Sequence, residues 1–579
     1  MHSNRLRLRL RLMFAVVSCV TALAVVGCGG PPSIRPDLAY ARDADDRPVE
    51  QMESRDPSLE WETVDRTLFV QAEQALDLRR GFGSFWGSPI QAANMNRFDD
   101  VPDCAWFTNR HGRSPLTPDD IRTGIALTPG PDTTGPWLVF RPKIQGATVG
   151  FWIQDARGDE YIIKFDPVGY PELSTAAAAM GARYLHACGY NVPQETIVYW
   201  RPEWLSIKDG ATITDADGTK RLMTRADVDS ILARVQHQPD GSIRSLASLS
   251  LAGTGTLKGP FSYDGRRDDD PNDWCDHEDR RELRGLYVIA SLINHYDLKD
   301  QNTLDVFVRT DGDRGYLQHY LIDFGSTFGS DGRGPKHPRK GYANGFDLKD
   351  VLISWATLGL KRWAWQDNVP SPYPSIGMFE SENFHPGTFD PIVPNPAFDN
   401  MTDRDAYWGA KIVMAWRDEH LRALVASGEF SDSAAAEYLF QRLVERRDKI
   451  GRHWFSRVNP LDYIEVLGGG HGMLISFDDL SVRYGLEPEV GNRYHYVVKY
   501  DGNEVVSGVS EESAVVLSIT DLASMAEVYK AGNEDKDHLY RLEIRTERPG
   551  KKLSKPTVVW LWYDDQESSF EYVGLEHVD

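Results

Sequence analysis

His295-Tyr-Asp-Leu-Lys-Asp-Gln-Asn302 is the stretch that decides the fold of this 579-residue chain. It follows residues 279–294, where apolar side chains recur at helical spacing, and it precedes a strand predicted over residues 303–309. A polar stretch at the end of an apolar helix is expected to be a loop. This loop carries three chemically useful side chains, which are Asp297, Lys299 and Asn302.

Asp323-Phe-Gly325 ends a second strand, predicted over residues 316–322, which a turn joins to the first. Upstream, residues 148–153 and 160–165 are predicted to form another hairpin, and Lys164 lies on its second strand. An Ala-rich helix over residues 174–187 should follow, with Ser174 as its N-cap and Gly189 as its stop.

Phosphoryl transfer needs a cation on the phosphates, ligands for a metal ion and a carboxylate near the incoming hydroxyl. In the protein-kinase arrangement these are a strand lysine, a loop aspartate, an asparagine five residues later and the aspartate of Asp-Phe-Gly. Lys164, Asp297, Asn302 and Asp323 follow one another in that order.

Over residues 146–329 the chain therefore resembles the protein-kinase-like superfamily, and within it the atypical HipA-like and CotH-like kinases. The resemblance implies a two-lobed domain that uses ATP and Mg²⁺. It implies that Lys164 contacts the nucleotide phosphates, that Asp297 is the catalytic base and that Lys299 steadies the transferred group. It further implies that Asn302 and Asp323 bind Mg²⁺.

Two features depart from that family. Gly146-Ala-Thr-Val-Gly150 stands where a glycine loop would cover the phosphates, with Gly146 and Gly150 as the nucleotide-binding glycines, but it is not GxGxxG. The family also pairs its strand lysine with a glutamate in the following helix, where this chain has Ala178. Glu172, just before that helix, is the nearest substitute.

The fold class expected for the whole chain is α+β. A kinase-like domain is predicted over residues 136–460, with a small lobe over 136–200, an insertion over 208–245 and a large lobe over 246–460 that includes helices near 405–427 and 433–455. An N-terminal extension covers 61–135. A linker at 467–472 is expected to lead to a β-sandwich-like domain over 473–579, where alternation is strong.

The N-terminus resembles a bacterial lipoprotein signal peptide over residues 1–28. Four arginines precede an apolar run over residues 12–26, too short for a comfortable span of about 20 residues, and Gly27-Cys28 follows. The resemblance implies a lipid (palmitate) anchor on Cys28 and a location in the cell envelope. Residues 29–60, rich in Pro, Asp and Arg, are predicted to be a disordered tether.

Composition limits the partners. A net charge of −22 disfavours nucleic acid. Cys104, Cys188 and Cys275 remain after the signal peptide, which leaves room for one disulfide but forms no zinc motif. The acidic run at residues 268–278 lacks the spacing of a calcium loop and is interpreted as a solvated loop.

Three functions stay open at this point. The first is an envelope-anchored kinase that phosphorylates an unknown protein or glycan acceptor with ATP and Mg²⁺. The second is a pseudokinase-like binding or scaffold protein, favoured by the missing helix glutamate. The third is nucleotidyl transfer on the same scaffold.

Overall fold

The computed structural model describes residues 44–55, 90–143, 149–215, 218–345, 353–469, 472–518, 522, 539–564 and 569–579. All of them belong to one compact unit, Tyr40–Asp579. The predicted signal peptide with Cys28, and Gly146 of the glycine stretch, lie outside the described residues. Within the described ranges no helix combines the length and the apolar character that a membrane crossing requires.

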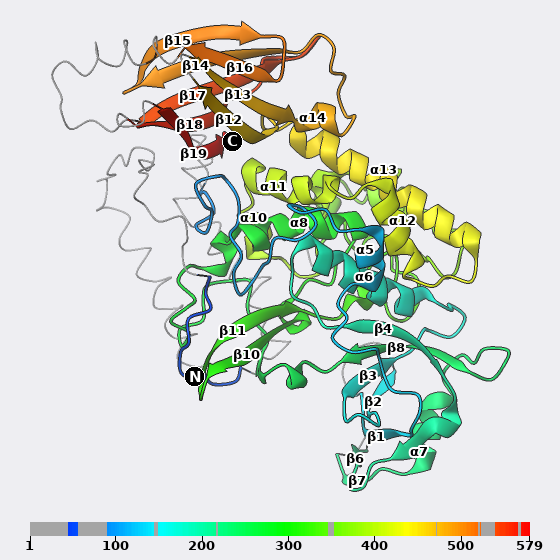
Figure 1. Cartoon of the computed structure of the whole chain (residues 1–579). Helices are drawn as coiled ribbons and strands as arrows, with labels where there is room; N and C mark the ends of the chain where they lie inside the picture. The colour runs from blue at the N-terminus through cyan, green and yellow to red at the C-terminus, as the bar shows by residue number, and fades with distance from the viewer. Residues whose placement is uncertain are drawn as a thin grey trace. The chain divides into compact units, whose positions relative to one another are not determined.

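A six-stranded sheet holds the predicted Lys164 hairpin, and its strand order is β4-β8-β3-β2-β1-β5. Its strands are β1 (Trp137–Pro142), β2 (Gly150–Gln154), β3 (Glu160–Lys164), β4 (Glu195–Trp200), β5 (Leu205–Ile207) and β8 (Ile243–Leu249). Residues 208–245, predicted as an insertion, begin with β6 (Thr212–Thr214), β7 (Lys220–Leu222) and α7 (Arg225–Leu232) (Figure 1).

Strand β8 lies between β3 and β4 inside the sheet, outside the boundaries predicted for the small lobe. The small lobe was expected to end at residue 200, so the sheet continues past that boundary. Six of the seven β8 residues are buried, so both faces of the strand are covered. A strand buried on both faces shows no alternation of apolar and polar residues, and for that reason the pattern did not mark it.

Helix α6 (Leu173–Cys188) follows β3 and is buried along almost its entire length. The predicted Ser174 cap is wrong, since the helix is preceded by Glu172 in a left-handed conformation (φ 67°). Asp166 satisfies the first turn instead, accepting the N–H groups of Glu172, Ser174 and Thr175 at 2.8–3.0 Å. Gly189, with φ 127°, ends the helix as predicted.

The predicted loop lies between helix α8 (Arg281–Ile293) and a three-stranded sheet in the order β11-β10-β9. These strands are β9 (Thr256–Gly259), β10 (Thr303–Asp311) and β11 (Arg314–Leu321). The predicted helix and both predicted strands around the loop are therefore confirmed. Asn294 ends α8 in a left-handed conformation (φ 51°), which turns the chain into the loop.

Further helices in the described ranges pack into one large core with α6 and α8. They are α5 (Pro118–Thr123), α10 (Pro396–Asp399), α11 (Asp403–Met414), α12 (Asp418–Ala426) and α13 (Ser433–Phe455). The helix predicted near 405–427 is thus two helices. The chain breaks at residues 415–417, where Trp416 is fully buried and the backbone N–H of Arg417 donates to His420 Nδ1.

Two antiparallel sheets make up the C-terminal part and share one hydrophobic core. The sheets have the orders β12-β13-β16 and β15-β14-β17-β18-β19. Their strands are β12 (Leu461–Gly469), β13 (Gly472–Asp479), β14 (Arg493–Tyr500), β15 (Asn503–Ser510), β16 (Ala514–Ser518), β17 (Leu539–Glu547), β18 (Thr557–Asp564) and β19 (Ser569–His577), with helix α14 (Leu480–Arg483) after β13. The predicted linker instead joins β12 to β13 as a hairpin, so the β part begins at Leu461.

Residues 44–55 do not follow the prediction of a disordered tether. Val49 and Gly315 exchange backbone hydrogen bonds at 2.7 and 3.0 Å, which adds a bridge to the edge strand β11. Asp45 is buried and pairs with Arg280 at 2.9 Å. The composition of this stretch is polar, but the backbone of Val49 and the carboxylate of Asp45 find partners on the folded body.

Candidate functional site

The β10–β11 hairpin brings the two predicted metal ligands to the same place. Ile322 donates its backbone N–H to the carbonyl oxygen of Asn302 at 2.9 Å, one step beyond the register pair Thr303–Leu321. Asn302 and Asp323 therefore flank the base of one hairpin. Asp323 has a left-handed backbone (φ 63°), a conformation that costs a non-glycine residue energy and often occurs at functional sites.

Lys164 and Asp323 form an ion pair between the six-stranded sheet and the hairpin base. Lys164 Nζ lies 3.1 Å from Asp323 Oδ1, with the lysine side chain 11% exposed and the aspartate side chain 44% exposed. The Lys164 ammonium lowers the pKa of Asp323 to about 2, against the effect of burial. Asp323 is thus a carboxylate at any physiological pH, as a metal ligand must be.

The loop residues hold one another around Asp297. Lys299 Nζ lies 2.8 Å from Asp297 Oδ1, and Asn302 Nδ2 donates to Asp297 Oδ2 at 3.0 Å and to the Asp297 carbonyl at 2.7 Å. Burial raises the pKa of Asp297, and the Asp323 charge adds to this, while Lys299 opposes it. The carboxylate is therefore oriented by two neighbours and is more basic than an exposed aspartate.

His295 and Phe324 connect the loop to the hairpin base. Their rings are 5.8 Å apart in an edge-on arrangement. Burial lowers the pKa of His295 to about 4, so the imidazole is neutral at pH 7. Phe324 is fully buried against Gly181 of α6, where an added Cβ would meet its Cβ at 2.7 Å. These two residues fix the site and carry no charge.

Sequence reasoning missed Glu195, which lies on β4. In the sheet register Glu195 pairs with Ser248 of β8, and Ser248 pairs with Ile162 of β3, two residues before Lys164. Side chains two apart on a strand, and side chains paired across strands, share one face. Glu195 and Lys164 therefore lie on the same face of the sheet.

The Glu195 side chain is 3% exposed and interacts electrostatically with both Lys164 and Asp323. Its Oε1 accepts a hydrogen bond from Ser248 Oγ at 3.0 Å, whereas Oε2 is buried with no hydrogen-bond partner among the described residues. Burial raises the pKa of Glu195, and Lys164 opposes this. A buried carboxylate of this kind is the second acid available to Lys164.

A second lysine also escaped the sequence analysis. Lys143 follows β1 and its backbone N–H donates to the Gly150 carbonyl at 2.9 Å. Burial, together with the positive charge of Lys164, lowers the pKa of Lys143 to about 8, while Asp323 acts in the opposite direction. Two ammonium groups thus converge near Asp323, a feature suited to an anionic ligand.

Gly150 and Glu172, the other predicted nucleotide-binding residues that the structure describes, have packing and backbone partners of their own. Gly150 pairs directly with Lys164, and a Cβ there would collide with the carbonyl oxygen of Ile163, so the residue permits close strand packing. Both carboxylate oxygens of Glu172 accept the Ser431 N–H at 3.1 Å. No ion pair joins Glu172 to Lys164, both of which the structure describes, and Glu195 is the acid that shares a sheet face with Lys164.

Two side-chain oxygens at the hairpin base are available to a divalent cation. Asn302 uses its Nδ2 for Asp297 and Asp323 uses Oδ1 for Lys164, which leaves Asn302 Oδ1 and Asp323 Oδ2 without a hydrogen bond among the described residues. Mg²⁺ prefers such oxygen ligands, usually one or two from the protein. No group of three or more His, Cys, Asp and Glu side chains poised to hold a metal occurs in the described ranges.

Comparisons with known proteins give weak likenesses. No family model matches the chain, and no curated protein does. Among solved structures, the Helicobacter pylori proinflammatory kinase CtkA is similar at a TM-score of 0.28 and 10% identity, over 55% of this chain and 99% of that one. The Golgi casein kinase with Mn/ADP bound is similar at a TM-score of 0.23 and 11% identity, over 55% of this chain and 72% of that one.

The extracellular region of rat CD45, domains d3–d4, gives a TM-score of 0.12 and 13% identity, over 17% of this chain, which spans 46% of that one. Two of these three neighbours are kinases, but scores this low carry no argument about activity. The class of the chain is a mixed helix-and-sheet protein with several sheets, and its function has to be argued from its own side chains.

Proposed function

We propose that this chain is an envelope-anchored, atypical kinase-like phosphotransferase with a two-lobed catalytic domain and a sandwich-like C-terminal domain. The single observation that carries the proposal is the meeting of Lys164, from the sheet, with Asp323, which follows the β10–β11 hairpin, at 3.1 Å. Asn302 and Asp297 stand at the same hairpin base. The four residues predicted from sequence order therefore lie around one site.

Each side chain has a task in the proposed reaction. Lys164 and Lys143 hold phosphate oxygens of ATP by charge. Asp297 accepts the proton of the acceptor hydroxyl, with Lys299 and Asn302 keeping its carboxylate in place. Asn302 and Asp323 would hold Mg²⁺, which neutralises charge on the phosphates. His295 and Phe324 maintain the spacing between the loop and the hairpin base.

A pseudokinase-like scaffold of the cell envelope is the second candidate. The observation that favours it is the position of Glu172, which is held by Ser431 and leaves the α6 end without an acid for Lys164. If Glu195 does not serve Lys164, nucleotide would bind without being turned over.

The deciding experiment uses the purified full chain with Mg-ATP and follows both nucleotide binding and the mass of modified protein. Phosphoryl transfer adds about 80 mass units, whereas nucleotidyl transfer adds more. Asp297→Asn should retain binding and lose about a hundredfold in rate, and Asp323→Asn should lose both. No nucleotide binding by the wild type would reject the enzyme, and binding without any transfer would favour the scaffold.

The proposed lipid anchor is tested separately. Cys28→Ala should leave the signal peptide uncleaved and abolish labelling by a palmitate analogue, while Cys19→Ala, inside the signal peptide, should not. Unchanged processing of Cys28→Ala would reject the anchor.

A further inference from the structure

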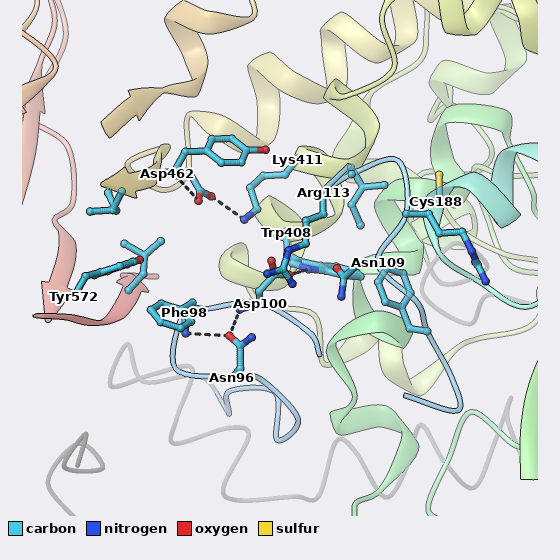
Figure 2. A pocket seen from close by; sticks show the side chains of 17 residues that line it. Asn96, Phe98, Asp100, Asn109, Arg113, Cys188, Trp408, Lys411, Asp462 and Tyr572 are labelled. Carbon is cyan, nitrogen blue, oxygen red and sulfur yellow. Dashed lines mark hydrogen bonds and ion pairs between the residues drawn. The ribbon is translucent and has the colours of Figure 1, made fainter. Parts of the chain in front are cut away.

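A cavity of about 280 Å³, whose lining side chains Figure 2 draws, has none of the residues of the proposed kinase site in its wall. It is lined by the N-terminal segment 96–113, the end of α6, helix α11 and strands β12 and β19, so we call it the junction cavity. Liquid water occupies about 30 Å³ per molecule, so the cavity has room for about nine waters. A cavity of that size can hold a small polar molecule such as one sugar ring.

Aromatic rings form much of its wall. Phe98 and Tyr572 face the cavity from two different segments, Trp408 comes from α11, and Tyr463 comes from β12. Flat apolar faces of this kind pack against the C–H faces of a ring-shaped ligand, while the phenol groups offer hydrogen bonds at the edge. Walls of aromatic side chains with a few polar groups are typical of small-molecule sites.

Charged groups converge on the same space. Lys411 Nζ lies 2.7 Å from Asp462 Oδ2, and that oxygen also accepts the Tyr407 hydroxyl at 3.1 Å. The ammonium group has three N–H bonds, so two remain for other acceptors. Asp100 is fixed by Trp408, whose Nε1–H donates to its Oδ1 at 2.7 Å. The cavity therefore offers both donors and acceptors, as hydroxyl groups require.

The balance of charge is positive although the whole chain carries −22. Arg110, Arg113 and Lys411 line the cavity against two carboxylates, Asp100 and Asp462. Arg110 donates Nη1 to the carbonyls of His186 and Tyr190. Arg113 is exposed, and its guanidinium meets no hydrogen-bond or ion-pair partner in the part of the chain that the structure describes. One planar cation is thus available for a carboxylate.

Strand β12 has a β-bulge where it lines the cavity. The pairing of β12 with β13 shifts register between Asp462 and Glu465, and Tyr463 within this bulge has φ 50°. Bulges re-aim side chains and are enriched beside functional sites, and a left-handed tyrosine costs about 1 kcal/mol or more. The strained residue is one that lines the cavity.

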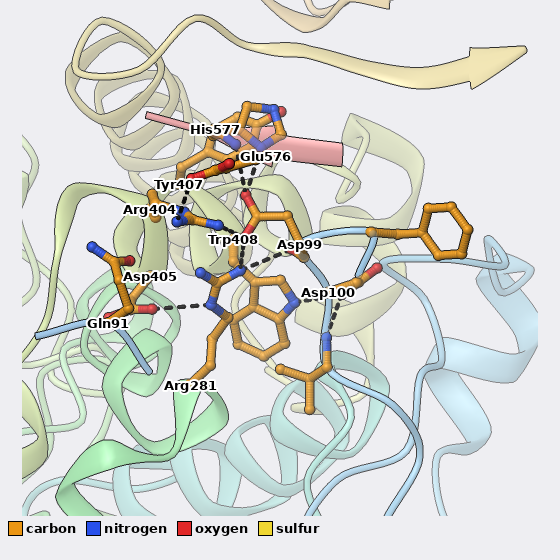
Figure 3. Close-up of polar contacts among 12 residues, drawn as sticks. Gln91, Asp99, Asp100, Arg281, Arg404, Asp405, Tyr407, Trp408, Glu576 and His577 are labelled. Atoms are coloured by element: carbon orange, nitrogen blue, oxygen red, sulfur yellow. Dashed lines mark hydrogen bonds and ion pairs between the residues drawn. The ribbon is translucent and has the colours of Figure 1, made fainter. Parts of the chain in front are cut away.

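Buried ion pairs make the cavity a preformed one (Figure 3). Asp99, next to the cavity residues Phe98 and Asp100, accepts hydrogen bonds from Arg281 at 2.6 Å, Arg404 at 2.9 Å and His577 at 2.7 Å. These partners come from α8, α11 and β19. Two of these partners, Arg404 and His577, come from elements that also line the cavity, so segment 96–113 is fixed to α11 and β19 before a ligand arrives.

We propose that the junction cavity binds one carboxylate-bearing sugar ring, as in the uronic-acid unit of an acidic glycan. The ring packs on Tyr463 and Tyr572, its hydroxyls bond Lys411 and Asp100, and its carboxylate pairs with Arg113. This site is independent of the proposed phosphotransferase, and Asp323→Asn should bind the sugar as the wild type does.

The test titrates the purified full chain with glucuronic acid and with glucose, which differ by the carboxylate, and measures binding by calorimetry or ligand-observed NMR. Glucuronic acid should bind, and glucose should bind about tenfold more weakly. Arg113→Gln should remove that preference. Tyr463→Gly, which suits the left-handed backbone, should weaken both sugars. Arg122→Gln, on α5 and 61% exposed, is the matched control and should change neither.

Two results would overturn the proposal. One is the absence of binding to either sugar at tens of millimolar by a wild-type chain with a cooperative thermal transition. The other is glucuronic acid binding that Arg113→Gln and Tyr463→Gly leave unchanged when both variants unfold at the wild-type temperature.

Discussion

The ammonium group of Lys164 lies 3.1 Å from Asp323 Oδ1, although 159 positions separate the two residues in the chain. Burial alone would lower the pKa of Lys164, but Asp323 and Glu195 outweigh it and hold the pKa above its ordinary value. The site is therefore poised around a permanent cation with two acids beside it. A ligand that withdraws Asp323 would leave Glu195 as the remaining counter-charge.

The Lys164–Asp323 pair makes stability depend on pH in the acid range. The pKa of Asp323 is lowered from 3.8 to about 2, so the stabilisation is complete above pH 4 and is lost as pH falls toward 2. Since the Asp323 side chain is 44% exposed, screening limits the effect to about 1 kcal/mol. Asp323→Asn should therefore unfold earlier than the wild type at pH 6, and the difference should shrink below pH 4.

Denaturant unfolding at several pH values measures this difference. The control is Asp313→Asn, because the Asp313 side chain is fully exposed and its replacement should track the wild type at every pH. A stability gap for Asp323→Asn that is the same at pH 3 and pH 6 would show that Lys164 does not hold Asp323 ionised.

Glu195→Gln tests whether the β4 acid positions Lys164. We expect kcat/KM for nucleotide to fall ten- to a hundredfold, because a displaced lysine no longer meets the phosphates. Stability should hold or rise, since the change removes a charge that burial penalises. Steady-state kinetics and thermal unfolding on the same samples separate the two effects.

Glu172→Gln is the matched control, because it changes a buried acid of the same type that bonds Ser431 instead of facing Lys164. It should leave the kinetics unchanged. Normal kinetics in Glu195→Gln, together with a loss in Glu172→Gln, would return the role to Glu172.

Lys299 should set the pH at which Asp297 becomes an active base. Burial raises the pKa of Asp297 and Lys299 lowers it. Removing that cation in Lys299→Met should therefore move the acid limb of the kcat/KM profile to higher pH, whereas Lys299→Arg should keep it near the wild-type position. A pH–rate profile of the three proteins measures the shift. An acid limb that Lys299→Met leaves in place would mean that another group titrates there.

The sequence was sufficient for the parts of the site that depend on local order. The loop from His295 to Asn302 is adjacent to a strongly periodic helix, and Asp323 directly follows a strand of a short hairpin, so both could be placed from pattern and turn signals alone. Their order and spacing along the chain led to the chemistry that we propose for the site.

Glu195 could not be found in that way. In Glu-Thr-Ile-Val-Tyr-Trp it is a single acid on a short strand, and only its pairing with Ser248 of β8, across 53 positions, turns it toward Lys164. The prediction of a solvated loop for the acidic run at 268–278 was wrong for a related reason. Asp273 is buried between His277 and Arg280, and a pattern of charges does not reveal which of them find distant partners.

Gly150→Ala should destabilise the sheet that holds Lys164. An added Cβ would collide with the carbonyl oxygen of Ile163, a backbone atom that cannot swing away, so β2 and β3 must separate where Gly150 pairs with Lys164. We expect a loss of about 2 kcal/mol in unfolding free energy and weaker nucleotide binding. Gly253→Ala, with no atom within 4 Å of its added Cβ, should stay within about 0.5 kcal/mol of the wild type. Equal stabilities in denaturant unfolding would mean that β2 and β3 are not packed as closely as described.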